Sequence, residues 1–156
     1  MEYLVDTGVL LRLVNRRDAL HQQIFLAVNV IRRRGHQLVT TPQNMSEFWN
    51  VCTRPSSARG GFGYSAVATH HRLRLLERLA TVLPETPAIY LQWKKLLQTY
   101  QIMGVQVHDA RMVAAMLVHR VDHLLTLNLA DFRRYKLINV VSPADVESQV
   151  PRRERQ

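Results

Sequence analysis

Cysteine is almost absent from this chain, whose 156 residues include only Cys52. A single cysteine cannot form an internal disulfide or a cysteine-based zinc site. This excludes the small secreted domains that depend on disulfides. It also fits the reducing environment of the cytoplasm, where we expect the protein to be.

Long hydrophobic runs are also missing. No apolar stretch approaches the roughly 20 residues that a membrane-spanning helix needs. The N-terminal segment MEYLVDTGVLLRL contains acids and lacks the basic start of a secretion signal. With 47% hydrophobic and 21% charged residues, the composition is that of an ordinary globular protein. The length suits one domain, so we predict a single globular unit without a membrane partner.

Acidic residues are few, since 12 Asp and Glu stand against 21 Lys and Arg, which gives a formal net charge of +9. A charge of this sign and size attracts polyanions, and nucleic acid is the commonest of them. The basic residues form several short clusters spread along the chain. We therefore assign the attraction to the summed field of the protein and not to any single cluster.

Hydrophobic periodicity predicts strands and helices in alternation. Residues Glu2 to Val5 are apolar and β-prone, and Asp6-Thr7-Gly8 leads from this strand into a helix. Further helices are predicted over 18–34, from Pro42 onward, over 65–80, from Pro87 to near Gly104 and over 109–120; further strands are predicted over 37–40, 81–83, 123–127 and 137–141.

This alternation predicts an α/β fold with a central, mainly parallel sheet covered by helices on both faces. We assign residues 1–142 to the domain and expect residues 143–156 to form a frayed basic tail. Ligands of such sheets bind at the carboxyl ends of the strands. The residues that follow the predicted strands are therefore the first candidates for a functional site.

Four of the scarce acids interrupt apolar stretches: Asp6, Glu47, Asp109 and Asp131. Asp6 and Asp131 come just after predicted strands, and Asp109 lies at the N-terminal end of a buried helical stripe. Each of these three also fits a structural role, as a helix cap, a turn residue or a partner of the helix dipole. Glu47 lies roughly 150° from the centre of the apolar stripe of its helix, so periodicity alone does not select it.

Taken together, these segments resemble the PIN domain family, in particular the VapC-type toxin ribonucleases of toxin–antitoxin pairs. The matching segments follow in order over nearly the whole chain: VDTGVLL with Asp6, NMSEFWNV with Glu47, VHDARMVAAM with Asp109, and LLTLNLADFRRY with Asn128 and Asp131. Many members carry an acid where this chain has Asn128. Either Asn128 or Asp131, three residues later, therefore completes the site.

The resemblance implies a PIN-like α/β/α sandwich, a homodimer, bound Mg²⁺ or Mn²⁺, an RNA substrate and a cognate antitoxin that masks the site. The residues suit this chemistry, because Mg²⁺ prefers oxygen ligands and keeps several waters. We assign Asp6 and Asp109 as direct metal ligands. Glu47 binds through water or orients the attacking water, and Asn128 can supply a neutral oxygen. The predicted function is a Mg²⁺-dependent endoribonuclease.

Two alternatives remain open, and a third is disfavoured. A metal-free ribonuclease would use histidines as acid and base, but the seven histidines are dispersed and only His108 adjoins one of the acids. A catalytically inactive PIN-like RNA-binding module would account for the missing acid at Asn128. A dinucleotide-binding domain is disfavoured because no glycine-rich loop follows the first strand.

Overall fold

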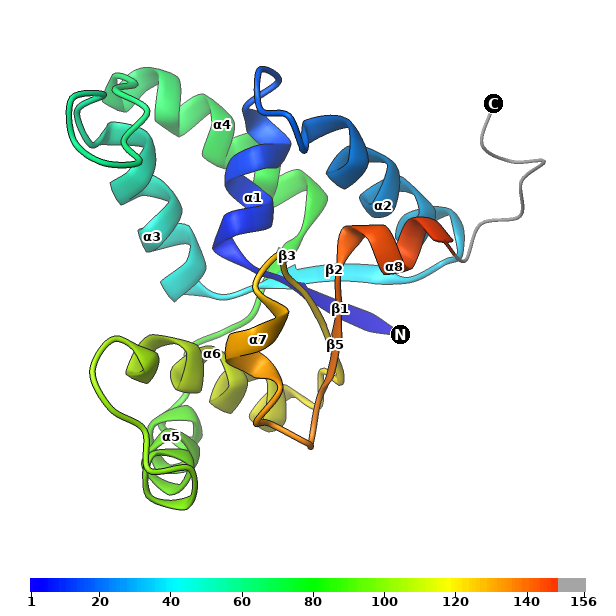
Figure 1. Cartoon of the computed structure of the whole chain (residues 1–156), viewed down its shortest axis with the longest axis vertical. Helices are drawn as coiled ribbons and strands as arrows, with labels where there is room; N and C mark the ends of the chain where they lie inside the picture. Colours follow the sequence, from blue (N-terminus) through cyan, green and yellow to red (C-terminus); the bar gives the residue numbers. More distant parts are fainter. Residues whose placement is uncertain (149–156) are drawn as a thin grey trace.

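A five-stranded parallel sheet forms the centre of the molecule in the computed structural model, which describes residues 1–148. The strands are β1 (Glu2–Val5), β2 (Gln37–Thr40), β3 (Thr81–Val82), β4 (His123–Leu125) and β5 (Asn139–Val141). They lie in the order β3-β2-β1-β4-β5, and each neighbouring pair is parallel (Figure 1). The chain therefore extends the sheet first to one side of β1 and then to the other, which creates a topological switch point between β1 and β4.

Helices cover both faces of this sheet, as the sequence predicts. The helices are α1 (Thr7–Val14), α2 (His21–Arg33), α3 (Pro42–Thr53), α4 (Ala66–Leu79), α5 (Pro87–Thr99), α6 (Gln106–His119), α7 (Leu129–Phe132) and α8 (Pro143–Ser148). Helices α1 to α4 and α8 pack in one hydrophobic cluster, and α5 to α7 pack in the other (Figure 1). The fold is thus an α/β/α sandwich. Within the described residues, no helix is long and apolar enough to span a bilayer.

The alternation of side chains along the central strands explains the two cores. Leu4 and Leu124 face the core beneath α5 and α6, whereas Val5 and Leu125 face the core beneath α1 to α4. Successive side chains of a strand point to opposite faces, so strands buried on both sides are continuously apolar. These short apolar runs are the signal from which the strands were predicted.

Element boundaries differ from the predictions where local polar contacts redirect the chain. Helix α5 ends at Thr99 and not near Gly104, because Gln101 adopts a left-handed backbone with φ of 50°. Strand β4 ends at Leu125, and Thr126 Oγ1 then accepts a hydrogen bond of 3.0 Å from the N–H of Asn128, which turns the chain. Helix α6 begins at Gln106, so Asp109 lies within its first turn.

The chain end also differs from the prediction of a frayed tail. Residues 143–148 form helix α8, which packs against α2 and buries Val146. Ser142 and Asp145 cap this helix reciprocally: Ser142 N and Oγ donate to Asp145 Oδ2 at 2.8 and 2.7 Å, and Asp145 N donates to Ser142 Oγ at 3.1 Å. The prediction of a frayed tail is therefore wrong for residues 143–148. Residues 149–156 lie outside the described residues.

Candidate active site

Asp6 lies at the switch point of the sheet, directly after β1. Its N–H donates to the carbonyl of Leu125 on β4 at 3.1 Å, and its carboxylate accepts a hydrogen bond of 2.7 Å from Thr126 Oγ1. The Asp6 side chain makes no capping hydrogen bond to α1, although the N–H groups of Thr7 and Gly8 lie close enough to favour its ionised form. The carboxylate is therefore held by the neighbouring strand and does not serve as an ordinary helix cap.

Glu47 reaches the same edge of the sheet from α3. Its carboxylate accepts hydrogen bonds from Thr7 Oγ1 at 2.7 Å and from Gln43 Nε2 at 2.9 Å. The side chain is half-buried, because α3 packs beside α1. Glu47 is thus positioned by two elements, although helical periodicity did not distinguish it from a solvent-facing residue.

A network of buried polar side chains supports Glu47. Thr41 caps α3 by accepting the N–H of Asn44 at 3.1 Å, and its hydroxyl donates to the Asn44 side-chain oxygen. Asn44, which is 1% exposed, in turn donates through Nδ2 to Thr7 Oγ1 at 3.0 Å. The Thr7 hydroxyl is thereby oriented to donate to Glu47. Each side chain of this network has a hydrogen-bond partner, as burial requires.

Sequence reasoning did not select these supporting residues. The segments that carry the acids contain or adjoin the four supporting residues Thr7, Gln43, Asn44 and Thr126. No pattern in a single sequence distinguishes them clearly. The available signal is weak: a threonine follows each of β1, β2 and β4 within two residues, at the edge where ligands bind. Threonines at strand ends are too common for that signal to stand alone.

Asp109 faces these acids from the first turn of α6, on the other helical layer. The pKa of its carboxyl is raised to about 6, first by burial and then by the negative charges of Asp6, Asp131 and Glu47, in that order of effect. The pKa of Asp6 is also raised, mainly by burial, with a contribution from Glu47. The tertiary structure therefore brings the other three predicted acids within electrostatic reach of Asp109.

Asn128 and Asp131 meet at the start of α7. The side-chain amide of Asn128 donates to the carboxylate of Asp131, which is half-buried, whereas Asn128 is exposed. The reverse amide orientation would place two oxygens in contact, so the nitrogen faces the carboxylate. Asp131 is the member of the pair whose charge acts on Asp109. Asn128 supports it.

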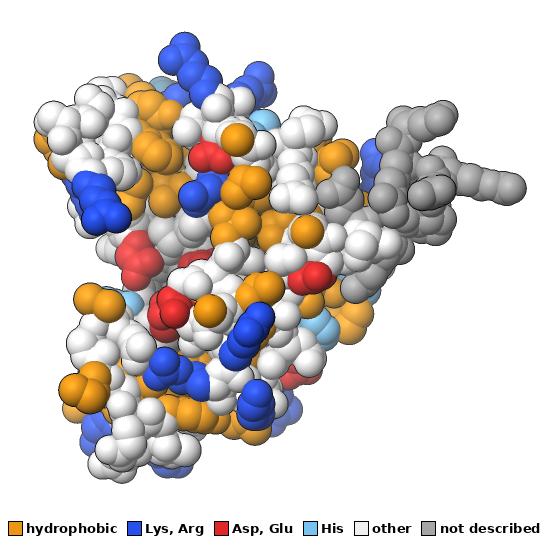
Figure 2. Space-filling model, in the orientation of Figure 1, with side chains coloured by type: hydrophobic (Ala, Val, Ile, Leu, Met, Phe, Trp, Pro, Cys, Tyr) orange, Lys and Arg blue, Asp and Glu red, His pale blue; other side chains and the backbone are white. Residues whose placement is uncertain are grey.

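These carboxylates suit a hard cation that keeps most of its waters better than a cation enclosed by protein ligands. Within residues 1–148, no three His, Cys, Asp or Glu side chains lie close enough to enclose a metal ion directly. Acidic side chains nevertheless gather in the hollow that opens between the α3–α4 part and the α5–α6 part (Figure 2). Mg²⁺ needs only one or two protein carboxylates and keeps its remaining waters. A cation would also relieve the repulsion that, after burial, raises the pKa of Asp109.

The histidines do not form a second catalytic set. His21 and His119 bond to backbone carbonyls, His36 and His123 pack on Tyr3, and His70 and His71 lie together on α4. Tyr3 and His123 belong to strands β1 and β4 at their amino ends, away from the acids. His108 alone adjoins the acid cluster, so no pair of histidines is available there as acid and base.

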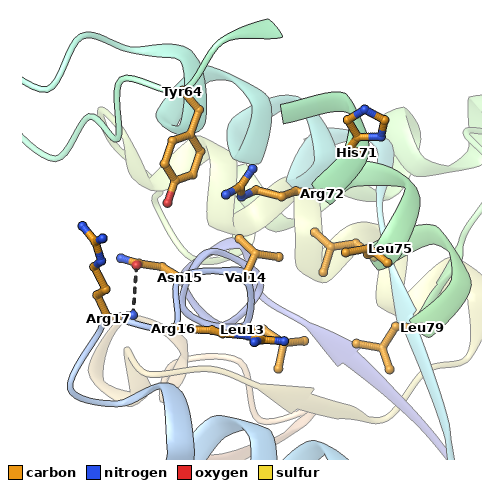
Figure 3. Close-up of a pocket in the computed structure, with 11 residues that line it drawn as sticks. Leu13, Val14, Asn15, Arg16, Arg17, Tyr64, His71, Arg72, Leu75 and Leu79 are labelled. Atoms are coloured by element: carbon orange, nitrogen blue, oxygen red, sulfur yellow. Dashed lines mark hydrogen bonds between the residues drawn. The ribbon is translucent and has the colours of Figure 1, made fainter. Parts of the chain in front are cut away.

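A second concave surface, which we call the α1–α4 groove, lies at the other end of α1 from Asp6. It encloses about 650 Å³ and is lined by Leu13, Val14, Asn15, Arg16, Arg17, Tyr64, His71, Arg72, Leu75, Leu76 and Leu79 (Figure 3). A cavity of about 320 Å³ beside α2 continues it and shares Leu13, Arg16 and Leu79. Arg72 stacks over Tyr64, with its guanidinium carbon 4.2 Å from the ring centroid. The groove thus has an apolar floor and a basic rim.

An α/β/α sandwich with carboxylates at the switch point of its parallel sheet is suited to metal-assisted cleavage of phosphate esters. The family model of the PIN domain matches residues 3–137, a range that includes all of the predicted site residues. The chain belongs to the PIN domain family, a family of nucleases. No curated protein matches the chain.

Solved structures share this fold at low sequence identity. A chain of VapBC2 from Rickettsia felis, crystallised with a DNA fragment from their promoter, matches with a TM-score of 0.67 and 12% identity over 91% of this chain and 98% of that chain. A chain of VapBC-1 from nontypeable Haemophilus influenzae matches with a TM-score of 0.64 and 19% identity, covering 92% and 99%. A chain of a toxin–antitoxin complex from Klebsiella pneumoniae matches with a TM-score of 0.62 and 20% identity, covering 90% and 97%.

Proposed function

We propose that the chain is an endoribonuclease that depends on Mg²⁺ or Mn²⁺. The observation that carries the proposal is the convergence of Asp6, Glu47 and Asp131 on Asp109, whose pKa is raised to about 6 by burial and by the charges of these three acids. Carboxylates held this close destabilise one another unless a cation or a proton is present. Membership of the PIN domain family supports nucleic-acid hydrolysis, and the net charge of +9 supports a polyanionic substrate.

Each residue has a role that follows from its contacts. Asp6, held by Thr126, and Asp109 would bind the cation directly. Glu47, held by Thr7, would bind through water or orient the attacking water. When bound, a divalent cation supplies a water of lowered pKa and offsets negative charge on the phosphate. The chain's own contribution is to hold the carboxylates and draw RNA toward them.

Cleavage of RNA by the purified chain tests this function directly. We expect cleavage in Mg²⁺ or Mn²⁺, none in EDTA, and products with 3′-hydroxyl and 5′-phosphate ends, because water and not the ribose 2′-hydroxyl attacks. Cleavage that persists in EDTA and leaves cyclic phosphates would favour a histidine mechanism. RNA binding without cleavage under any metal condition would favour an inactive RNA-binding module.

We further infer that the chain is the toxin of a toxin–antitoxin pair. Similar folds occur in toxin–antitoxin complexes, and the α1–α4 groove offers a docking surface. Its leucine floor and arginine rim fit an amphipathic segment with an apolar face and acidic flanks. A second copy fits less well because it carries the same positive charge. The partner would also mask the acid cluster, and a homodimer remains a separate prediction that sedimentation can check.

A further inference from the structure

We propose that Gln43 is a positioning residue for the metal site. Its amide joins the Glu47 carboxylate to the first turn of α6, which carries Asp109. This role presupposes the metal-dependent function proposed above. Gln43 itself would touch neither the cation nor the RNA phosphate.

The contacts of Gln43 cross the active-site edge of the sheet. Gln43 Nε2 donates to Glu47 Oε1 at 2.9 Å and to the backbone carbonyl of His108 at 3.0 Å. Glu47 belongs to α3 in one helical layer, and His108 precedes Asp109 on α6 in the other. One amide group therefore links the two layers at the point where the carboxylates converge.

The carbonyl oxygen of the Gln43 amide also indicates a specific role. Gln43 Oε1 is buried and has no hydrogen-bond partner in the described structure. Exchanging the amide oxygen and nitrogen would place the oxygen against two acceptors, so the orientation is determined by its surroundings. A buried carbonyl without a partner costs stability. A side chain that served packing alone would be apolar here, whereas both donors of this amide are used.

A nearby ion pair provides a matched control. Arg111, also on α6, pairs with Glu85 at 2.5 Å, and both residues line a small cavity next to Gln43. This pair ties α6 to the segment between β3 and α5, whereas the Glu47 carboxylate bonds to Thr7 and Gln43. Glu85→Gln thus loosens α6 without releasing the carboxylate, whereas Gln43→Met releases the carboxylate with little change in side-chain length.

Loss of the amide should leave the fold intact and loosen the site. Glu47 would keep only its bond from Thr7, and the first turn of α6 would lose its link to α3. Residues that orient metal ligands typically change metal affinity or activity by about 10- to 100-fold when they are removed. We therefore expect Gln43→Met to weaken Mn²⁺ binding about 10-fold or more while the metal-free protein unfolds near the parental temperature.

The experiment compares the full-length parent, Gln43→Met and Glu85→Gln by two readouts. Mn²⁺ titration, followed by the electron paramagnetic resonance signal of free Mn²⁺, should show weakened binding for Gln43→Met and parental binding for Glu85→Gln. Amide hydrogen exchange of the metal-free proteins should show faster exchange over residues 108–112 in Gln43→Met than in the parent. Thermal unfolding in EDTA checks that the fold is retained.

The possible outcomes separate this role from the proposed function. Parental Mn²⁺ affinity in Gln43→Met would overturn the positioning role, and so would an equal loss in Glu85→Gln or a loss that tracks thermal stability. If the parent itself binds no Mn²⁺ and cleaves no RNA, the metal-dependent function fails. In that case, unchanged amide exchange in Gln43→Met would also show that Gln43 does not hold α6 to α3.

Discussion

Asp109 carries the electrostatic cost of the acid cluster. Its carboxyl is half-buried, and its pKa is raised from 3.8 to about 6 by burial first and then by three neighbouring acids. A raised pKa means that the folded state binds the proton more tightly than the unfolded state. Ionisation of Asp109 therefore destabilises the metal-free fold. This cost is complete above about pH 6 and disappears as pH falls toward 3.8.

The substitution Asp109→Asn should separate stability from activity. In EDTA at neutral pH, we expect the variant to unfold at a higher temperature than the parent, because a half-buried charge that neighbouring acids repel is gone. This difference should shrink as pH is lowered from about 6 toward 3.8, where the parental carboxyl gains its proton. RNA cleavage should fall by about 100-fold or more, since a direct ligand is lost. Calorimetry and a cleavage assay measure the two effects; a parallel loss of both would indicate a structural role.

Asp131 and Asn128 should contribute unequally. Asp131→Ala should strongly raise the Mg²⁺ concentration needed for half-maximal cleavage, because its charge acts on Asp109. Asn128→Ala should have a smaller effect, because the amide only donates to Asp131. Asp122→Ala is the control, since this exposed acid precedes the amino end of β4. The reverse ranking would make Asp131 a turn residue and place Asn128 in the metal site.

At the scale of elements, α1, α2 and α4 leave an apolar surface uncovered. Leu75 is 58% exposed on the floor of the α1–α4 groove, and Phe25 on α2 is 47% exposed in the adjoining cavity. Exposed apolar side chains ringed by arginines are typical of a surface that another chain covers. The acid cluster lies beyond the opposite end of α1, so partner binding and catalysis can be altered separately.

Substitution in this groove should impair antitoxin binding without impairing cleavage. Leu75→Arg should weaken association with the cognate antitoxin on co-expression and purification, because it places a charge in the apolar floor and adds to the basic rim. The free variant should cleave RNA like the parent. Leu91→Arg is the matched control, since Leu91 is 55% exposed on α5, outside the groove. Equal association of both variants would rule out the groove as the docking surface.

At the scale of the whole molecule, the charge of +9 should govern RNA affinity. Binding that neutralises phosphates releases counterions, so the logarithm of affinity should fall linearly with the logarithm of salt concentration, by about 0.7 per phosphate contacted on a single strand. The cleavage-deficient Asp109→Asn variant keeps the RNA intact during the titration. A flat salt dependence would show that the net field does not drive binding.

Much of the architecture could be predicted from sequence because its signals are local. Short apolar runs such as Glu2 to Val5, with helical stripes between them, determined the order of elements and the parallel α/β class. The acids that interrupt these runs indicated most of the candidate site. Glu47 also interrupts an apolar stretch, but helical periodicity placed it away from the apolar face of its helix and could not indicate what packs over it. Its place in the site was inferred from the family resemblance.

The supporting contacts were decided by the tertiary structure. Thr126 bonds to Asp6 across 120 positions of sequence, and Gln43 bonds to His108 across 65. The α1–α4 groove and the packing of α8 on α2 also depend on segments distant in the chain. Sequence by itself determined which chemical groups are present and which local structure they favour. Only the folded chain decided which of them meet, because hydrogen bonds and charge repulsion depend on distances that local periodicity does not encode.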